Sequence, residues 1–444
     1  MMLLDKYLNR ITNTKRKVLA NVFWALSGKI ITLFSTLLVS ILVARYLGPE
    51  QFGMMNYIIS VVSLFSIFAT FGMTDIVIRE LSKKEIPDNE ILGTAFVLRM
   101  VLSLLTILGV IIYSLLCEAQ EGMDCMMIIY SIYLIFACFD VIRSYFTSII
   151  QNKRVVMSEV SRSLIGALVK IVLIIIHAPL VYFITALTLD FVLLALGYFA
   201  NYQKVADYKQ WKFNSQFAVF LIKCSLPLLI AGATATIYQR IDQVMIAKLI
   251  DTTSVGYFST ALSFVGIVTF IPTIMIQTVS PLLVGYSRNN PQRYAIESQR
   301  VMNVIVWATI IFCCAISLLS YPIIRYSYGV EYIAAVPVMQ ILVFKAVGIA
   351  LTMVGGQLII IENIHKYAFI RNILACIVCI ASNYLLIPHW GIIGSTWATI
   401  LTVLFSGGLG NLFIPPYHHI LRKQCISILF GWKDLFSIKN YIMK

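Results

Sequence analysis

Charged residues are scarce in this sequence of 444 residues. Asp, Glu, Lys and Arg make up 12% of it and hydrophobic residues 60%, whereas a soluble protein carries about twice that charged fraction. No stretch of 50 or more polar residues occurs, so we expect no separate soluble domain. Apolar runs of about 20 residues, the length that crosses a bilayer, recur along the chain. The composition therefore predicts an all-α polytopic membrane protein.

The sequence also lacks the motifs of common catalytic and metal sites. It has no GxxxxGK[ST] loop, which argues against ATP hydrolysis by this chain, and neither HExxH nor an EF-hand loop. The five histidines fall at span ends, in loops or near the C-terminus. Cys376 and Cys379 form a CxxC without the second half of a zinc site, so we interpret them as packing residues. We expect no enzymatic activity, no cofactor and no bound metal.

Hydropathy predicts about twelve membrane spans in two sets of six. The first set is 20–44, 52–78, 91–116, 125–150, 155–178 and 180–202; the second is 218–247, 256–284, 301–324, 335–361, 368–387 and 391–414. The first span is too long for a signal peptide core and has no cleavage site behind it, so we expect it to remain as an anchor. The predicted parts are an N-terminal segment (1–19), an N-lobe (20–202), a linker (203–217), a C-lobe (218–414) and a tail (415–444).

The distribution of Lys and Arg predicts the orientation. With the N-terminus inside, 24 of the 34 basic residues fall in cytoplasmic segments, and only Arg45, Lys248 and Arg325 fall in outer loops. This is the bias that the positive-inside rule describes. The N-terminal segment, the linker and the tail are therefore predicted to be cytoplasmic. The net charge of +14 then needs no nucleic-acid partner to explain it.

Arg143 and Arg371 are counted with the cytoplasmic segments, and twelve further charged residues lie inside the predicted spans. They are Lys29, Arg99, Arg162, Lys170, Lys223, Arg240, Lys345, Asp75, Asp140, Glu159, Asp190 and Asp242. Each costs about 2.5–3.5 kcal/mol at the centre of a span, so such side chains normally face protein or water. Glu159, Arg162 and Lys170 share one face of the fifth span, and Asp140, Ser144 and Thr147 share one face of the fourth. We therefore predict a hydrated cavity in the N-lobe that opens to the cytoplasm and is positively charged.

Basic residues are the main candidates for binding in this cavity. We select Arg162, Lys170, Lys29, Arg99, Arg143, Lys345 and Arg240. Structural interpretations remain open for several charges. Lys223 lies at the start of a span, where a lysine extends to the interface, and Asp140 with Arg143 has the spacing of a simple ion pair within one helix.

The two sets of spans carry a weak internal repeat. Ala44–Gly53 joins the first span to the second, and Ala247–Gly256, displaced by 203 residues, joins the seventh to the eighth. Only the Ala, the basic residue and the Gly agree, but the match falls at the same place in each set. Six spans per half give both halves the same orientation, so we expect them to be related by an axis along the membrane normal.

Several stretches resemble one family of membrane transporters. The residues that carry the resemblance are Asn21-Val22-Phe23-Trp24, Ala44-Arg45-Tyr46-Leu47-Gly48-Pro49-Glu50-Gln51-Phe52-Gly53, Gly72, Ile78-Arg79-Glu80-Leu81, Ile237-Tyr238-Gln239-Arg240-Ile241-Asp242 and Gly256-Tyr257-Phe258. On these residues the sequence resembles the Wzx-type O-antigen and polysaccharide flippases of the MOP (multidrug/oligosaccharidyl-lipid/polysaccharide) exporter superfamily. The run from Leu47 to Gly53 is fairly specific.

The resemblance implies a MATE-like fold of two six-helix lobes and a role in the bacterial inner membrane. Such a protein moves an undecaprenyl-pyrophosphate-linked oligosaccharide, such as an O-antigen unit, to the outer leaflet by alternating access. Arg and Lys suit the anionic pyrophosphate. The resemblance also implies coupling to a gradient of H+ or Na+, for which the candidates are Asp140, Glu159, Asp190 and Asp242. Membrane lipids, a polysaccharide polymerase and a chain-length regulator are the expected partners.

Other functions remain open at this point. A multidrug or cation exporter on the same fold would need an acidic cavity, whereas basic residues outnumber acidic ones within the spans. A lipid-linked sugar polymerase or ligase would need sizeable outer loops, and the predicted outer connections are short. A membrane scaffold would not explain polar faces on two helices.

Overall fold

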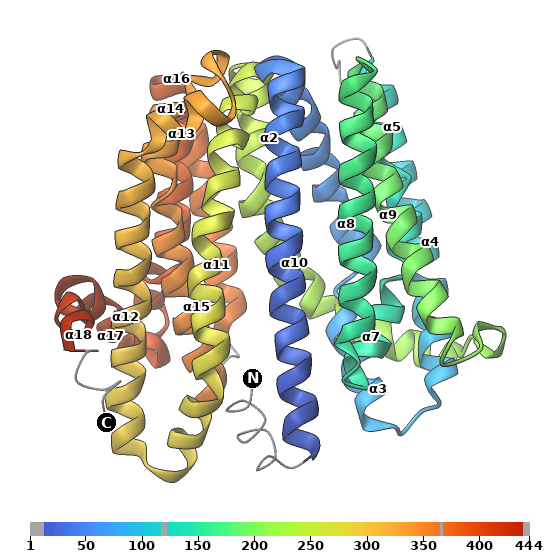
Figure 1. The fold of residues 1–444 in the computed structure, drawn as a ribbon. Coiled ribbons are helices and arrows are strands. Elements are labelled where there is room, and N and C mark those ends of the chain that lie inside the picture. The colour runs from blue at the N-terminus through green and yellow to red at the C-terminus, as the bar shows by residue number, and fades with distance from the viewer. Residues whose placement is uncertain (1–12, 117–121, 365–366, 438–444) are drawn as a thin grey trace, which may run out of the picture. The chain divides into compact units, whose positions relative to one another are not determined.

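The computed structural model describes residues 13–116, 122–364 and 367–437, and these ranges contain helices and connecting segments but no strand (Figure 1). Residues 1–12 and 438–444, which belong to the predicted N-terminal segment and tail, lie outside the described residues. Nine helical stretches in the described part are long and apolar enough to cross a membrane. The chain is therefore a multi-pass membrane protein.

The described part of the first half of the chain forms eight α-helices. They are α2 (Asn13–Thr70), α3 (Thr74–Lys83), α4 (Asp88–Leu116), α5 (Met123–Ser131), α6 (Tyr133–Ala137), α7 (Asp140–Ser148), α8 (Asn152–Ile175) and α9 (Leu180–Gln203). Gly48, with φ of 73°, interrupts α2 directly before Pro49. This is where the first two predicted spans meet, and glycine adopts this backbone conformation without strain.

The described part of the second half forms seven α-helices before the tail. They are α10 (Ser215–Leu249), α11 (Thr252–Asn289), α12 (Pro291–Leu318), α13 (Ser320–Ser327), α14 (Ala335–Leu342), α15 (Lys345–Ile361) and α16 (Ala368–Gly407). Gly391, with φ of 56°, interrupts α16 at the first residue of the last predicted span. Most helices follow the predicted spans, but 52–78 is divided between α2 and α3, 125–150 between α5, α6 and α7, and 335–361 between α14 and α15. The count of twelve and the orientation of the ends stay predictions. α8 corresponds to the fifth span but carries five charged residues and is not among the nine apolar stretches.

The described chain divides into two compact units whose limits differ from those of the predicted lobes. Unit 1 comprises the described residues of 1–46 and 61–233, and unit 2 comprises the described residues of 47–60 and 234–444. The division falls inside α10 and not in the predicted linker 203–217.

The linker belongs to unit 1 because it is bound to α4 and α9. Asn214 Nδ2 donates to Glu90 Oε2 at 2.7 Å, and Trp211 Nε1 donates to the Tyr202 hydroxyl at 2.9 Å. A Cβ atom at Gly93 would lie 2.6 Å from the carbonyl oxygen of Lys212, so the glycine leaves room for the linker to cross α4. The hydrophobic core of unit 1 then extends into the first turns of α10.

Residues 47–60 belong to unit 2 through a reciprocal contact with the start of α11. A Cβ at Gly53 would meet the carbonyl of Thr252 and lie 2.7 Å from the nitrogen of Gly256. A Cβ at Gly256 would meet the carbonyl of Pro49, 2.9 Å from its carbon. Gly53 and Gly256, like Pro49 and Thr252, are 203 residues apart. Each of the two matched segments therefore meets the other at corresponding residues, while the symmetry of the two sets of spans stays a prediction.

The described part of the tail is a folded part of unit 2. It forms α17 (His418–Phe430) and α18 (Trp432–Ser437). Trp307 Nε1 of α12 donates to the carbonyl of Ser427 at 2.8 Å, and Asn303 Nδ2 donates to Asp434 Oδ2 at 2.6 Å. Ile420 lies in the hydrophobic core of unit 2. These contacts fix the tail helices against α12.

Candidate functional site

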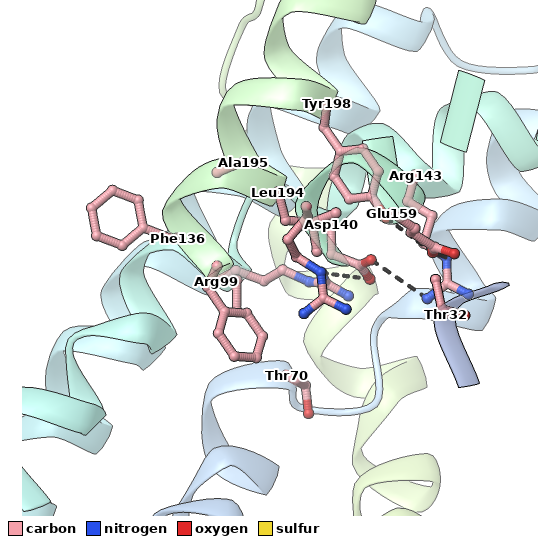
Figure 2. Close-up of a pocket in the computed structure, with 13 residues that line it drawn as sticks. Thr32, Thr70, Arg99, Phe136, Asp140, Arg143, Glu159, Leu194, Ala195 and Tyr198 are labelled. Carbon is pink, nitrogen blue, oxygen red and sulfur yellow. Dashed lines mark hydrogen bonds and ion pairs between the residues drawn. The ribbon is translucent and has the colours of Figure 1, made fainter. Parts of the chain in front are cut away.

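Unit 1 contains a cavity of about 340 Å³ that is lined by five charged side chains. Arg99 comes from α4, Asp140 and Arg143 from α7, and Glu159 and Arg162 from α8. Aromatic and aliphatic side chains, together with the hydroxyls of Thr32, Thr70 and Tyr198, complete the lining. Figure 2 shows Arg99, Asp140, Arg143 and Glu159 gathered beside Tyr198. The polar faces predicted on the fourth and fifth spans therefore meet in space.

Long ion pairs connect four of these charges. Arg99 Nη1 lies 3.6 Å from Asp140 Oδ2, and Arg143 Nη1 lies 3.8 Å from Asp140 Oδ1. Arg143 Nε lies 3.7 Å from Glu159 Oε1, to which the Tyr198 hydroxyl donates at 3.2 Å. Hydrogen bonds between such groups are usually 2.7–3.2 Å long. The acids therefore attract the guanidinium groups without saturating their donors.

Arg99 is held in place by the unit 1 core and by one strong hydrogen bond. Its side chain is buried, and its Nη2 donates to Thr74 Oγ1 at 2.6 Å. Its Nε is buried without a hydrogen-bond partner. Arg99 thus contributes fixed positive charge at the cavity wall.

Arg162 has no acidic residue within ion-pair distance among the described residues. Its Nε is buried without a hydrogen-bond partner. The cavity therefore holds three arginines against two acids. A partly buried cation without a partner is unfavourable, so this arrangement favours binding of an anion.

The structure separates Lys170 from this cavity. Its Nζ lies 2.6 Å from Asp190 Oδ2, and the two side chains are 14% and 11% exposed. Neither residue is part of the cavity lining, although the sequence predicted Lys170 to face the same space as Arg162. Lys170 is directed away from the cavity because it forms an ion pair with Asp190 of the neighbouring helix α9.

The remaining cationic candidates lie elsewhere. Lys29 is exposed on α2, one turn before Thr32, and does not line the cavity. Arg240 is partly exposed on α10 in unit 2. Lys345 is buried at the start of α15, also in unit 2, with 7% of its surface exposed. Their role as substrate ligands stays a prediction.

Unit 2 contains a second polar cluster, centred on Asp242 of α10. The residue is 1% exposed. Asn383 Nδ2 donates to its Oδ1 at 2.7 Å, and Thr399 Oγ1 donates to its Oδ2 at 2.7 Å. Cys379 Sγ lies 3.4 Å from Oδ1. Asn383 precedes and Thr399 follows the break at Gly391, so one carboxylate connects both stretches of α16 to α10.

Sequence reasoning missed Asn383, Thr399 and Arg371. The first two are uncharged, and their signal was a polar side chain in an otherwise apolar span. Arg371 was assigned to a cytoplasmic segment, but the structure buries it in α16 with 6% exposure and with Nε and Nη1 unpartnered. Cys376 and Cys379 are both buried, and Cys379 also contacts Asp242. Among the described residues, no group of three or more His, Cys, Asp or Glu could hold a metal ion.

The fold is shared with transporters of the MOP superfamily. Lipid II flippase MurJ, in an inward closed conformation, superposes with a TM-score of 0.73 at 15% identity, over 93% of this chain and 92% of that chain. An inward-facing MATE multidrug resistance transporter gives 0.63 at 15% identity, over 88% and 96%. The MATE multidrug transporter DinF-BH gives 0.58 at 15% identity, over 91% and 96%. At these identities the similarity establishes the fold alone.

The family follows from a match to the sequence itself. A family model described as polysaccharide biosynthesis protein matches residues 18–287, more than half of the chain. The chain belongs to this family of polysaccharide biosynthesis proteins, and its fold is the one seen in the MurJ flippase and in MATE transporters of the MOP superfamily. No match was found among curated proteins.

Proposed function

We propose that this protein moves an undecaprenyl-pyrophosphate-linked oligosaccharide, such as an O-antigen repeat unit, across the bacterial inner membrane. Transport runs from the cytoplasmic to the outer leaflet by alternating access. The observation that carries the proposal is the cavity of unit 1, where Arg99, Arg143 and Arg162 face two acids. The family of polysaccharide biosynthesis proteins and the MurJ-like fold support it.

The chemistry of the cavity suits a pyrophosphate. A guanidinium group binds phosphate oxygens through two parallel charge-assisted hydrogen bonds. Asp140 and Glu159 orient Arg99 and Arg143 at 3.6–3.8 Å and leave their donors available. Arg162 has no such partner and offers the strongest attraction to an incoming anion. In this proposal the flipped unit is then used in the outer leaflet by a polymerase and a chain-length regulator.

Charge reversal at Arg162 tests the cargo site. Arg162→Glu should lower surface polysaccharide by about 10- to 100-fold in a strain that depends on this protein, because one charged hydrogen-bonded contact contributes about 1.5–3 kcal/mol. Arg162→Lys should retain part of the activity, since lysine keeps the positive charge but cannot form the two parallel hydrogen bonds of a guanidinium group. Arg325→Glu, an exposed arginine outside the cavity, is the matched control. Normal polysaccharide from Arg162→Glu at wild-type protein level would refute the site.

We propose Asp242 as the carboxylate that couples transport to an ion gradient of H+ or Na+. Asp140 and Glu159 contact arginines of the cavity, and Asp190 is paired with Lys170. Asp242 instead connects α10 to both stretches of α16, so a change in its ligation alters the packing of three helical segments. Asp242→Asn should abolish the dependence of flipping on the gradient in proteoliposomes. Gradient dependence that survives the substitution would exclude Asp242.

A multidrug or cation exporter is the second candidate, because the MATE transporters share this fold and the cavity contains Asp140 and Glu159. The two functions predict opposite results for one variant. Arg162→Glu makes the cavity net acidic and should improve export of a cationic dye, whereas it should impair a flippase for an anionic lipid.

A further inference from the structure

A second cavity of unit 1 lies directly beside the cavity that contains the three arginines. It has a volume of about 220 Å³, and its lining consists of the apolar residues Phe136, Phe139, Val192, Ala195, Leu196 and Phe199. Phe136 of α6 and Ala195 of α9 also line the charged cavity (Figure 2). The two cavities therefore share a wall. We refer to the second one as the apolar pocket.

An interruption of the fourth predicted span shapes the apolar pocket. α6 ends at Ala137, and α7 begins at Asp140. Between them the backbone amide of Phe139 donates to the carbonyl of Phe136 at 3.2 Å, a bond to the third residue back and not to the fourth. In such a tightened turn, residues three apart lie one above the other, and turns of this kind within a helix are frequent at functional sites. Phe136 and Phe139 therefore face the same space, while the next residue, Asp140, lines the charged cavity.

Aromatic packing fixes two walls of the apolar pocket, and the third side is open. The ring of Phe139 lies 5.1 Å from that of Phe96 and 6.1 Å from that of Phe199, both in the edge-to-face arrangement that aromatic pairs prefer. All three rings pack against the hydrophobic core of unit 1. On the open side, Leu196 is 58% exposed on α9, a helix long and apolar enough to cross a membrane, so this surface faces lipid chains. The apolar pocket thus lies between the arginines and the bilayer.

We propose that the apolar pocket binds the first part of the hydrocarbon chain of the lipid-linked cargo, next to its pyrophosphate, so that the two cavities together form one site for an anionic isoprenoid lipid. The inference rests on the proposed function, because it takes the position of the pyrophosphate from the charged cavity. An occupant of both cavities must be an amphiphile, since arginines attract an anion and an apolar lining excludes one. A small group such as a water molecule or a methylene takes about 30 Å³, so the apolar pocket holds on the order of seven carbon groups, roughly one or two isoprene units.

The experiment measures how much a short chain adds to the binding of pyrophosphate. Purified full-length protein in lipid nanodiscs is titrated with inorganic pyrophosphate and with geranyl pyrophosphate, and the signal of empty nanodiscs is subtracted. Burial of one methylene group strengthens binding about fourfold, so we expect the wild type to bind geranyl pyrophosphate at least about 100-fold more tightly than inorganic pyrophosphate. Val192→Trp, which fills the apolar pocket, should reduce this ratio to less than about tenfold.

Leu189→Trp is the matched control, because Leu189 is exposed on the same helix and lines neither cavity. It should keep the full ratio of the two affinities. Arg162→Glu should weaken the binding of both ligands. A wild-type ratio in folded Val192→Trp would overturn the apolar pocket as the chain site and leave the proposed function standing. If the wild type binds neither ligand, or if Arg162→Glu weakens neither, the cargo site is itself wrong and this inference fails with it.

Photochemical labelling provides a second readout if Val192→Trp does not fold. Benzoylphenylalanine in place of Leu196 lies at the open side of the apolar pocket, where an exposed side chain is replaced without disturbing the core. We expect radioactive geranyl pyrophosphate to label this variant and not the variant with the same group in place of Leu189, and Arg162→Glu should reduce the labelling. Equal labelling of the two positions, or labelling that Arg162→Glu does not change, would show that the pocket takes ordinary membrane lipid or any apolar compound and would overturn the proposal.

Discussion

Gly166 leaves the space that the ion pair between Lys170 and Asp190 occupies, because glycine has no side chain. A Cβ atom at this position of α8 would collide with Asp190 Oδ1 and lie 3.0 Å from its carboxylate carbon. The carboxylate cannot simply move away, because Lys170 holds it at 2.6 Å. The glycine is therefore required by the close approach of α8 and α9 at this pair.

Gly166→Ala should destabilise unit 1 by about 1–3 kcal/mol, the usual cost of overpacking a closely packed site. The unfolding temperature of the purified protein, followed by tryptophan fluorescence, measures this effect. Gly232→Ala is the control, since nothing lies within 4 Å of a Cβ there and alanine favours a helix. Equal unfolding temperatures for Gly166→Ala and wild type would show that the pair is not packed as described.

The location of a single residue could be predicted where its polar neighbours lie on its own helix. The positions of Asp140, Arg143, Glu159 and Arg162 on neighbouring polar faces follow from helical periodicity, and the structure brings them together. The environment of Lys170 could not be predicted, because its partner lies on the next helix and periodicity gives no information on contacts between helices.

Neutral polar residues that contact a buried charge also could not be predicted from the sequence. Hydropathy and charge draw attention to Asp242, but Asn383 and Thr399 differ little from background in a sequence that is 60% hydrophobic. They become informative only once α16 is seen to bend at Gly391 and present both side chains to one carboxylate.

At the scale of elements, the crossing of the second stretch of α2 with the start of α11 depends on Gly53 and Gly256. Each glycine faces backbone atoms of the other helix, which cannot rotate away as a side chain can. The Leu47–Gly53 motif therefore has a structural reason in addition to its family resemblance: Gly48 breaks the helix and Gly53 permits the crossing.

Gly53→Ala and Gly256→Ala should each separate these helices and lower the unfolding temperature, with a loss of about 1–3 kcal/mol or more. Size-exclusion chromatography and thermal unfolding in detergent measure the loss. Gly356→Ala in α15 serves for comparison, because a Cβ there meets no atom within 4 Å. If the double variant is no less stable than either single variant, one shared displacement of the two helices accounts for both losses of stability. Wild-type unfolding temperatures for both single variants would contradict the close crossing.

At the scale of the whole molecule, the apolar runs predicted most of the helix boundaries. The limits of the compact units were not predictable, because they depend on which helices the linker contacts. Asn214 and Trp211 look like ordinary linker residues in the sequence, yet they bind Glu90 and Tyr202 and draw the first part of α10 into unit 1.

The charge bias predicts a topology that labelling can test. Single cysteines at Arg45 and Arg325, introduced into a variant without its native cysteines, should react with a membrane-impermeant maleimide in intact cells. Cysteines at Lys84 and Lys209 should react only after the membrane is opened. Labelling of Lys84→Cys in intact cells would contradict the predicted orientation and the count of twelve spans.

The exchange of contacts between Gly53 and Gly256 also has an evolutionary consequence. If one repeat existed as a separate polypeptide, its glycine would face the same glycine of an identical copy, as in the self-complementary interface of a two-fold homodimer. The contact thus has the form expected if an ancestral gene doubled and fused, with the old subunit interface preserved inside a single chain.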